Sequence, residues 1–143
     1  MSLLERAVQM SGDWGADRQA DRKRCATLLQ GIHDDMEEAI GLWEKAVAEA
    51  PAETNKFLLV VWVGAERARR LHRLYLRGKE TAAELTELTG VSFKDTLGMA
   101  EELQIETAYG ELKADESGAE RAKQAIETLT ERKSRVRDAL SNW

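Results

Sequence analysis

The chain has 143 residues and carries 21 basic and 26 acidic side chains, for a formal net charge of −5. This length fits one domain and is sufficient to bury a core without disulfide bonds, and the acidic balance argues against a surface that binds nucleic acid throughout. The composition is rich in Ala, Glu, Leu and Arg with a single proline, which is typical of a mainly helical protein. We therefore expect one domain over residues 1–143.

The sequence also indicates in which cellular compartment the protein is expected. The N-terminal residues lack the basic and apolar regions of a secretion signal, because Glu5 and Arg6 come first. The most apolar run, 57–65, is far shorter than the ~20 residues that a bilayer crossing needs. The lone cysteine, Cys25, has no partner for an intramolecular disulfide. We expect a cytoplasmic protein in which Cys25 is a small buried thiol.

A long first helix is expected over residues 17–50. Apolar residues recur there at spacings of three and four, which is the pattern of a heptad-like seam on one helix face. The Ala50-Pro51 pair should end the helix, because the residue before a proline is pushed out of the α region. The seam consists of Cys25, Leu29, Ile32, Met36, Ile40, Trp43 and Val47.

A second long helix is expected over residues 54–78. Its first half is apolar on every face, which indicates burial against several neighbours or another subunit. Gly78 is placed to end it in a left-handed conformation. In its amphipathic second half we expect Ala68, Leu71, Leu74 and Tyr75 to pack and Arg67, Arg69, Arg70, Arg73 and Arg77 to project.

Capping boxes predict where the later helices start. Such a box pairs Ser or Thr with an acidic residue three positions on, and each side chain satisfies a free backbone N–H of the other. Boxes at Thr81, Ser92 and Ser117, with a further one at Ser2, predict helix starts near residues 82, 93 and 118. Residues 80–104 should therefore form two short helices, about 82–89 and 93–104, around a turn.

The C-terminal part is expected to hold one more helix. Residues 105–113 alternate weakly between apolar and polar, so they fit either a strand or a continued helix, and 105–117 is a wing or a turn. A helix over residues 118–142 follows. Its seam is Ala122, Ala125, Ile126, Leu129, Val136 and Leu140.

The segment LYLRGKETAAELTELTGVS, ending at Ser92, resembles part of prokaryotic helix-turn-helix and winged-helix regulators and of antitoxin-type proteins that share the module. Gly90 would permit the tight turn and Val91 would fill the corner between two helices, as Leu85 and Leu88 pack behind them. The resemblance covers residues 68–112. It implies a helix-turn-helix-like module with a possible small β-wing. Together with the seams of the long helices, this predicts an all-α fold, or a mainly α fold with a small β-wing: a long-helix bundle with an embedded helix-turn-helix-like module.

The charge of this module argues against DNA as its partner. The outward residues of the recognition helix should be Phe93, Lys94, Leu97 and Glu101, which offer one cation, one anion and two apolar groups. Asp95 and Thr96 also depart from the family pattern, which commonly has Thr or Ser and then an apolar residue. Residues 80–120 hold eleven acidic residues against two lysines, and this excess would repel phosphate. Exposed Phe93 and Leu97 favour a protein partner.

The arginines before the module allow two interpretations. Arg69, Arg73 and Arg77, with Arg70, lie at helical spacing and could contact phosphates. We favour the interpretation that they pair with the acidic excess of residues 80–120.

No enzymatic motif stands out. His33 and Glu37 have the spacing of two metal ligands on a helix, but a single pair is weak, and the Glu-x-x-His pairs of di-metal bundles do not occur. Phosphate loops, dinucleotide fingerprints and nucleophile motifs are also missing from the sequence. We expect no catalysis, no cofactor and no metal.

The sequence thus predicts a non-enzymatic regulatory or interaction protein that contacts a protein partner through Phe93 and Leu97. The long apolar seams exceed the needs of one small module, so we expect a homodimer. DNA binding by the same helix with Arg69, Arg73 and Arg77 is a variant of this hypothesis. A helical-bundle scaffold or subunit of a larger complex, with no DNA binding, is the alternative.

Overall fold

The computed structural model describes residues 3–49, 63–93 and 118–143 of the chain. Of these residues 90% are helical and none lies in a strand, so the all-α prediction is confirmed for this part. The elements are α1 (Leu3–Gly12), a 3-10 turn η1 (Ala16–Arg18), α2 (Gln19–Glu49), α4 (Ala65–Thr89) and α7 (Gly118–Ser141).

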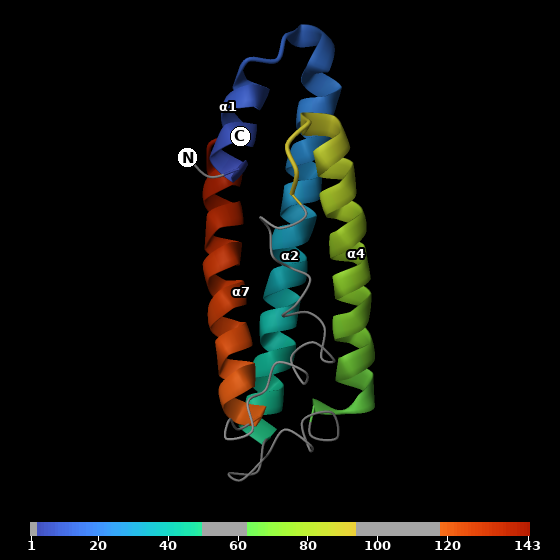
Figure 1. Cartoon of the computed structure of the whole chain (residues 1–143), viewed down its shortest axis with the longest axis vertical. Coiled ribbons are helices and arrows are strands. Elements are labelled where there is room, and N and C mark those ends of the chain that lie inside the picture. Colours follow the sequence, from blue (N-terminus) through green and yellow to red (C-terminus); the bar gives the residue numbers. More distant parts are fainter. Residues whose placement is uncertain (1–2, 50–62, 94–117) are drawn as a thin grey trace.

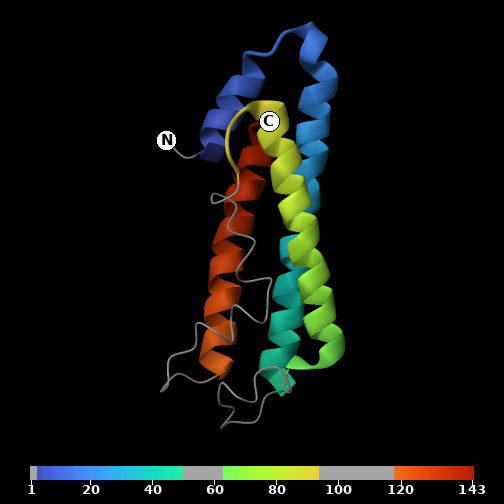
Figure 2. The same cartoon turned by 45° about the vertical axis from the view of Figure 1, so that its right-hand side comes forward.

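The three long helices lie side by side, and α2 runs antiparallel to both α4 and α7 (Figures 1 and 2). Helix α2 packs most extensively on α7 and less on α4, while α1 lies against α7. The described part is therefore a helical bundle built around α2.

Arginines at the start of α2 tie the ends of the other two helices to it. Arg18, in η1, donates from Nη2 to the backbone oxygen of Leu88 at 2.8 Å. Arg22 donates to the backbone oxygen of Trp143, and the Trp143 indole Nε1 donates back to the oxygen of Arg22 at 2.9 Å. Cationic donors suit helix C-termini because the last carbonyls have no partner within the helix.

The predicted seams form the core. On α2 every predicted seam residue from Cys25 to Trp43 is buried, and Val47 is partly buried against the core. On α7 the seam also packs inward, with Ala122 and Ala125 buried. These small side chains let the backbones of α7 and α2 approach closely, which accounts for their extensive contact. Both predicted helices are thus confirmed with shifts of one or two residues at their ends.

Helix α4 corrects the predicted break at residues 78–81. The helix does not stop at Gly78 but continues to Thr89, and the Thr81 hydroxyl donates to the backbone oxygen of Arg77 at 2.9 Å instead of capping a new helix. A helical glycine costs about 1 kcal/mol relative to alanine. Burial of Leu74 and Leu85 on one continuous face outweighs that cost.

The break predicted at Gly90 is confirmed. Gly90 adopts a left-handed φ of 72°, and its N–H donates to the oxygen of Thr86 at 2.8 Å. The Thr86 hydroxyl accepts the N–H of Phe93 at 3.1 Å, which folds the chain back over the last turn of α4. Phe93 is consequently 1% exposed and belongs to the core. The prediction that Phe93 faces outward was wrong. It assumed that a new helix begins at residue 93 and that the helical period places Phe93 on its solvent-facing side.

Several predicted features lie outside the described residues. They include residues 54–62 of the expected second helix, the second helix of the module and the wing at 105–117. Lys94, Leu97 and Glu101 lie there as well. The helix-turn-helix module therefore stays a prediction, although the segment expected as its separate first helix is the end of α4. Within the described residues, α4 begins only at Ala65, because Gly64 adopts a left-handed φ of 90°, so the predicted continuous helix through residue 64 was wrong.

Among the helices described, none combines the length and the apolar character that a bilayer crossing requires.

The continuous α4 predicts a small effect of Thr81→Ala. A mid-helix threonine that bonds back to the preceding turn should be replaceable within about 0.5 kcal/mol in the free energy of unfolding, whereas loss of a true N-cap costs about 1 kcal/mol. Urea denaturation measures the difference. Thr89→Ala is the control, because its buried hydroxyl donates to Leu85 and accepts from the Val91 N–H, and its loss should cost about 1–2 kcal/mol. A cost at Thr81 equal to that at Thr89 would contradict the continuous helix.

Candidate functional site

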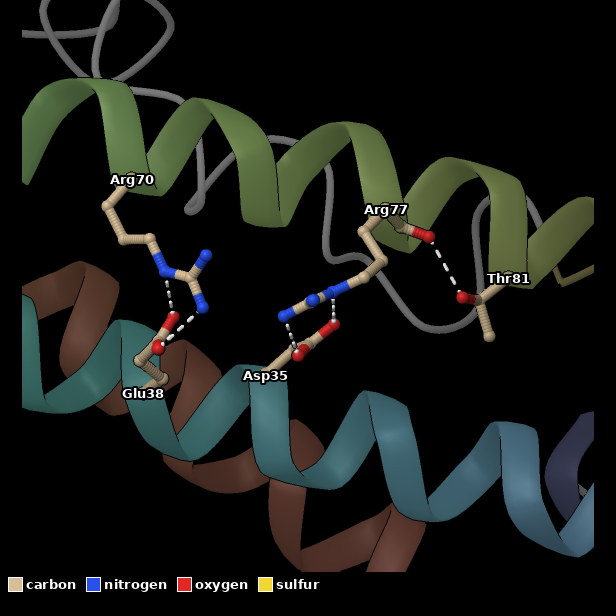
Figure 3. Close-up of polar contacts among 5 residues, drawn as sticks. All are labelled: Asp35, Glu38, Arg70, Arg77 and Thr81. Carbon is tan, nitrogen blue, oxygen red and sulfur yellow. Dashed lines mark hydrogen bonds and ion pairs between the residues drawn. The ribbon is translucent and has the colours of Figure 1, made fainter.

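Helix α4 turns one side toward α2, and ion pairs line that side. Arg77 donates two hydrogen bonds to Asp35, at 2.9 Å from Nε and 2.6 Å from Nη2, and Arg70 makes the same fork with Glu38 at 2.7 Å for both (Figure 3). Arg67 of α4 donates a single hydrogen bond from Nη2 to Glu49, at the far end of α2, at 2.7 Å. The acids therefore come from α2 and not from residues 80–120, so the predicted pairing of Arg70 and Arg77 was wrong.

Asp35 is the buried member of this row. Its side chain is 12% exposed, whereas the Arg77 side chain is 51% exposed. Asp35 lies on the core-facing stripe of α2, three residues after Ile32 and four before Ala39, both of which are buried. The helical period alone would have placed Asp35 on this stripe, although the sequence analysis did not single it out.

A further pair joins the two helices toward the other end of α4. Arg24 of α2 holds Glu84 through two hydrogen bonds of 2.8 and 2.9 Å, and both side chains are exposed to solvent by 40% or more. The side-chain hydrogen bond from Arg24 is the main cause that lowers the pKa of Glu84. Since both groups are exposed, the pair contributes little to stability.

The opposite side of α4 faces solvent and carries a different set of groups. Leu76 is 46% exposed, and no other large apolar side chain in the described part of the chain is exposed. Arg69 and Arg73 make no ion pair with a described residue. We name this exposed stripe the α4 outer face, and it consists of Arg69, His72, Arg73, Leu76, Lys79, Glu80, Ala83 and Glu87.

Tyr75 supports the edge of the α4 outer face. The His72 ring stacks on Tyr75 with centroids 6.0 Å apart, and Lys79 Nζ lies 5.4 Å from the Tyr75 ring centroid. These contacts hold two cationic or polar side chains along the flank of the helix. The face therefore presents an apolar centre with charged groups around it.

The predicted site residues divide into three groups. Arg69 and Arg73 are exposed on the α4 outer face, as expected. Arg77 is bound to Asp35 and Phe93 is in the core, so neither is available to a partner in the predicted manner. The remaining three lie outside the described residues: Lys94, Leu97 and Glu101. Leu76 was not singled out from the sequence. It adds an exposed apolar side chain to the helix face that carries Arg69 and Arg73.

His33, Asp34 and Glu37 form a cluster on α2 that could hold a cation. One ligand atom of each lies within 4.8 Å of the others. Asp34 already accepts a hydrogen bond from Gln30 at 2.9 Å and contacts His33 Nδ1 at 3.2 Å, and these two bonds lower its pKa, with His33 the larger cause. Hydrogen bonds within one helix thus account for the arrangement of these side chains.

Cys25 has the environment of a structural thiol. Its side chain is fully buried in α2, and burial, with a smaller contribution from the Asp21 carboxylate, raises its pKa to about 11. A thiol is nucleophilic only as the thiolate. Cys25 therefore stays protonated and inert at neutral pH.

Comparison with protein-family models, with curated proteins and with solved structures found no match to this chain. A function for the chain therefore has to be inferred from its own residues.

The burial of Asp35 predicts an unequal effect of two arginine substitutions. Arg77→Met should lower the free energy of unfolding, because the nearly buried Asp35 carboxylate loses its partner. We expect a moderate loss of about 1–3 kcal/mol, since the Arg77 side chain is half exposed and water screens the pair. Arg70→Met is the matched control and should cost less than about 0.5 kcal/mol, since Glu38 is exposed enough to be rehydrated. Urea denaturation measures both. Equal costs would show that Asp35 is solvated.

The raised pKa of Cys25 predicts a loss of stability at high pH. The folded chain keeps the thiol proton that the unfolded chain releases, so stability is unaffected below about pH 9 and falls as the pH rises toward 11. Cys25→Ala lacks this titration and should show a shallower fall over the same range. The measurement is the free energy of unfolding against pH for both chains. Parallel profiles would contradict the burial of an un-ionised thiol.

Proposed function

We propose that this chain is a non-enzymatic interaction protein that binds a protein partner through the α4 outer face. The observation that carries the proposal is Leu76, an exposed apolar side chain that follows Arg69 and Arg73 on the same helix face, and these two arginines have no carboxylate partner among the described residues. An isolated exposed leucine would need no explanation, but one centred on a helix face with unpaired cations has the form of a docking stripe.

The spacing of the residues suits a helix or groove laid against α4. Arg69, His72, Arg73 and Leu76 lie at i, i+3, i+4 and i+7, so they share one face over two turns. Arg69 and Arg73 repel each other at this spacing in the free chain. Carboxylates from a partner would relieve that repulsion while an apolar group covers Leu76. The chemistry of the partner is therefore acidic around an apolar centre.

DNA is the less favoured partner for this face. Arg77, which was expected to help contact phosphates, is committed to Asp35. Arg69 and Arg73 remain, and Glu66 and Glu80 lie on either side of them along the helix. Because non-specific DNA affinity grows with the number of phosphates neutralised, two arginines between acids offer little. The resemblance of residues 68–112 to regulators of transcription favours a regulatory role. Because the face offers little to DNA, we propose that this role is exerted through protein contacts.

A photo-crosslinking amino acid at position 76 tests the proposal. In the native host we expect a discrete protein adduct from position 76, and we expect its yield to fall by about tenfold when Arg73→Glu is added, because the partner's carboxylates would then be repelled. Position 130 on the exposed side of α7 is the control site and should give no such adduct. Equal adducts from both positions, or none from position 76, would refute a docking role for α4.

A further inference from the structure

We infer that the partner of the α4 outer face is a second copy of this chain, which lies antiparallel across it with Leu76 near the two-fold axis. This inference rests on the proposed function, since it names the occupant of the same face. A homodimer was expected from the long seams, but those seams are packed within one chain in the described residues. We therefore place the dimer contact on the α4 outer face and not on the seams.

The order of charges along the face carries the inference. Arg69 and Arg73 precede Leu76, and Glu80 follows it. Lys79 also follows it, but its ammonium lies over the Tyr75 ring on the flank of the helix, 5.4 Å from the ring centroid, so along the edge that carries Arg73 and Glu80 the charge changes from positive to negative at the exposed leucine. A two-fold interface brings the same patch of both copies together, and each residue before the axis faces one after it. Such a patch binds itself only if the residues related by the axis are complementary, and Arg73 and Glu80 have opposite charge.

The distances along the helix match as well. Arg73 precedes Leu76 by three residues, or about 4.5 Å of rise, and Glu80 follows it by four residues, or about 6 Å. In an antiparallel pair each Arg73 thus lies within about 1.5 Å of the level of Glu80 on the other copy, well within the reach of an arginine side chain. Arg69 lies opposite Ala83, a small residue with Glu80 and Glu87 on either side.

The same groups are not satisfied inside one chain. Arg73 and Glu80 are two helical turns apart, and neither forms an ion pair with a described residue. A parallel second copy would set arginines against arginines. Glu66 and Glu87 lie ten and eleven residues from Leu76, where two crossing helices have already separated, so the repulsion between them has little influence on the contact.

The interface is small, because it consists of one helix face from each copy. Contacts of this size are weak and reversible, and exposed ion pairs are sensitive to salt. The self-association should therefore appear as a concentration-dependent equilibrium that added salt shifts toward the monomer.

Charge reversal with rescue tests the inference by sedimentation velocity on the full chain from micromolar to millimolar concentration. Arg73→Glu and Glu80→Arg should each weaken the dimer by about tenfold or more, because each places like charges opposite each other twice. The double variant restores both pairs in reversed polarity and should bring the dissociation constant back to within about threefold of the original. A structural role for either residue would give no rescue.

A matched control separates position from net charge. Lys123→Glu changes the charge by the same amount on the exposed side of α7 and should leave the dimer unchanged. Circular dichroism melts show whether each variant is folded, and Leu76→Ser provides a second route that removes the apolar centre without changing charge. Loss of the dimer in this variant supports the inference.

The outcomes distinguish the inference from the proposed function. A chain that stays monomeric at millimolar concentration while position 76 still crosslinks to a different protein would overturn self-association and leave the docking role intact. A dimer that ignores the charge variants would place the contact elsewhere and also overturn the inference. A monomer with no adduct from position 76 would overturn both.

Discussion

The arrangement of this bundle depends on the ion pair between Asp35 and Arg77. A carboxylate on the core-facing stripe of α2 needs a counter-charge, and Arg77 supplies it through two hydrogen bonds from α4. Arg70 and Glu38 repeat the fork two turns earlier on α4 and about one turn later on α2, so the pairs progress in opposite directions along the two helices. This fixes the antiparallel register of α4 and its rotation about its own axis. The same rotation turns Leu76 to the outside.

The parts of the fold that depend on local periodicity could be predicted from the sequence. The seams of α2 and α7 recur at three and four residues, and burial follows that period because one face of each helix meets the core. The course of α4 could not be predicted in the same way. Gly78 and Thr81 carry stop and start signals of about 1 kcal/mol each, and tertiary packing on both sides of them is larger. Only Gly90, where packing and local signal agree, ends the helix.

The residues of the candidate site also differ in whether local periodicity alone could predict their environment. Arg69 and Arg73 were predicted because an exposed cation on an amphipathic helix is a local property. The partner of Arg77 could not be predicted, since it lies 42 residues away on a different helix. Phe93 was misplaced because its environment depends on the chain folding back onto α4 at Thr86. Asp35 and Leu76 follow the helical period and could have been placed from the sequence, whereas the partner of Arg77 and the burial of Phe93 depend on tertiary contacts.

The topology has a consequence for how the chain is made. Helix α2 packs most extensively on α7, yet the two are separated in sequence by α4 and everything between Glu49 and Gly118. During synthesis α2 leaves the ribosome long before its main partner exists, and closing so long a loop is slow compared with local contacts. The buried stripe that includes Trp43 is therefore left without its main partner until α7 has been made. The nascent chain, rather than the finished bundle, is the form most exposed to aggregation.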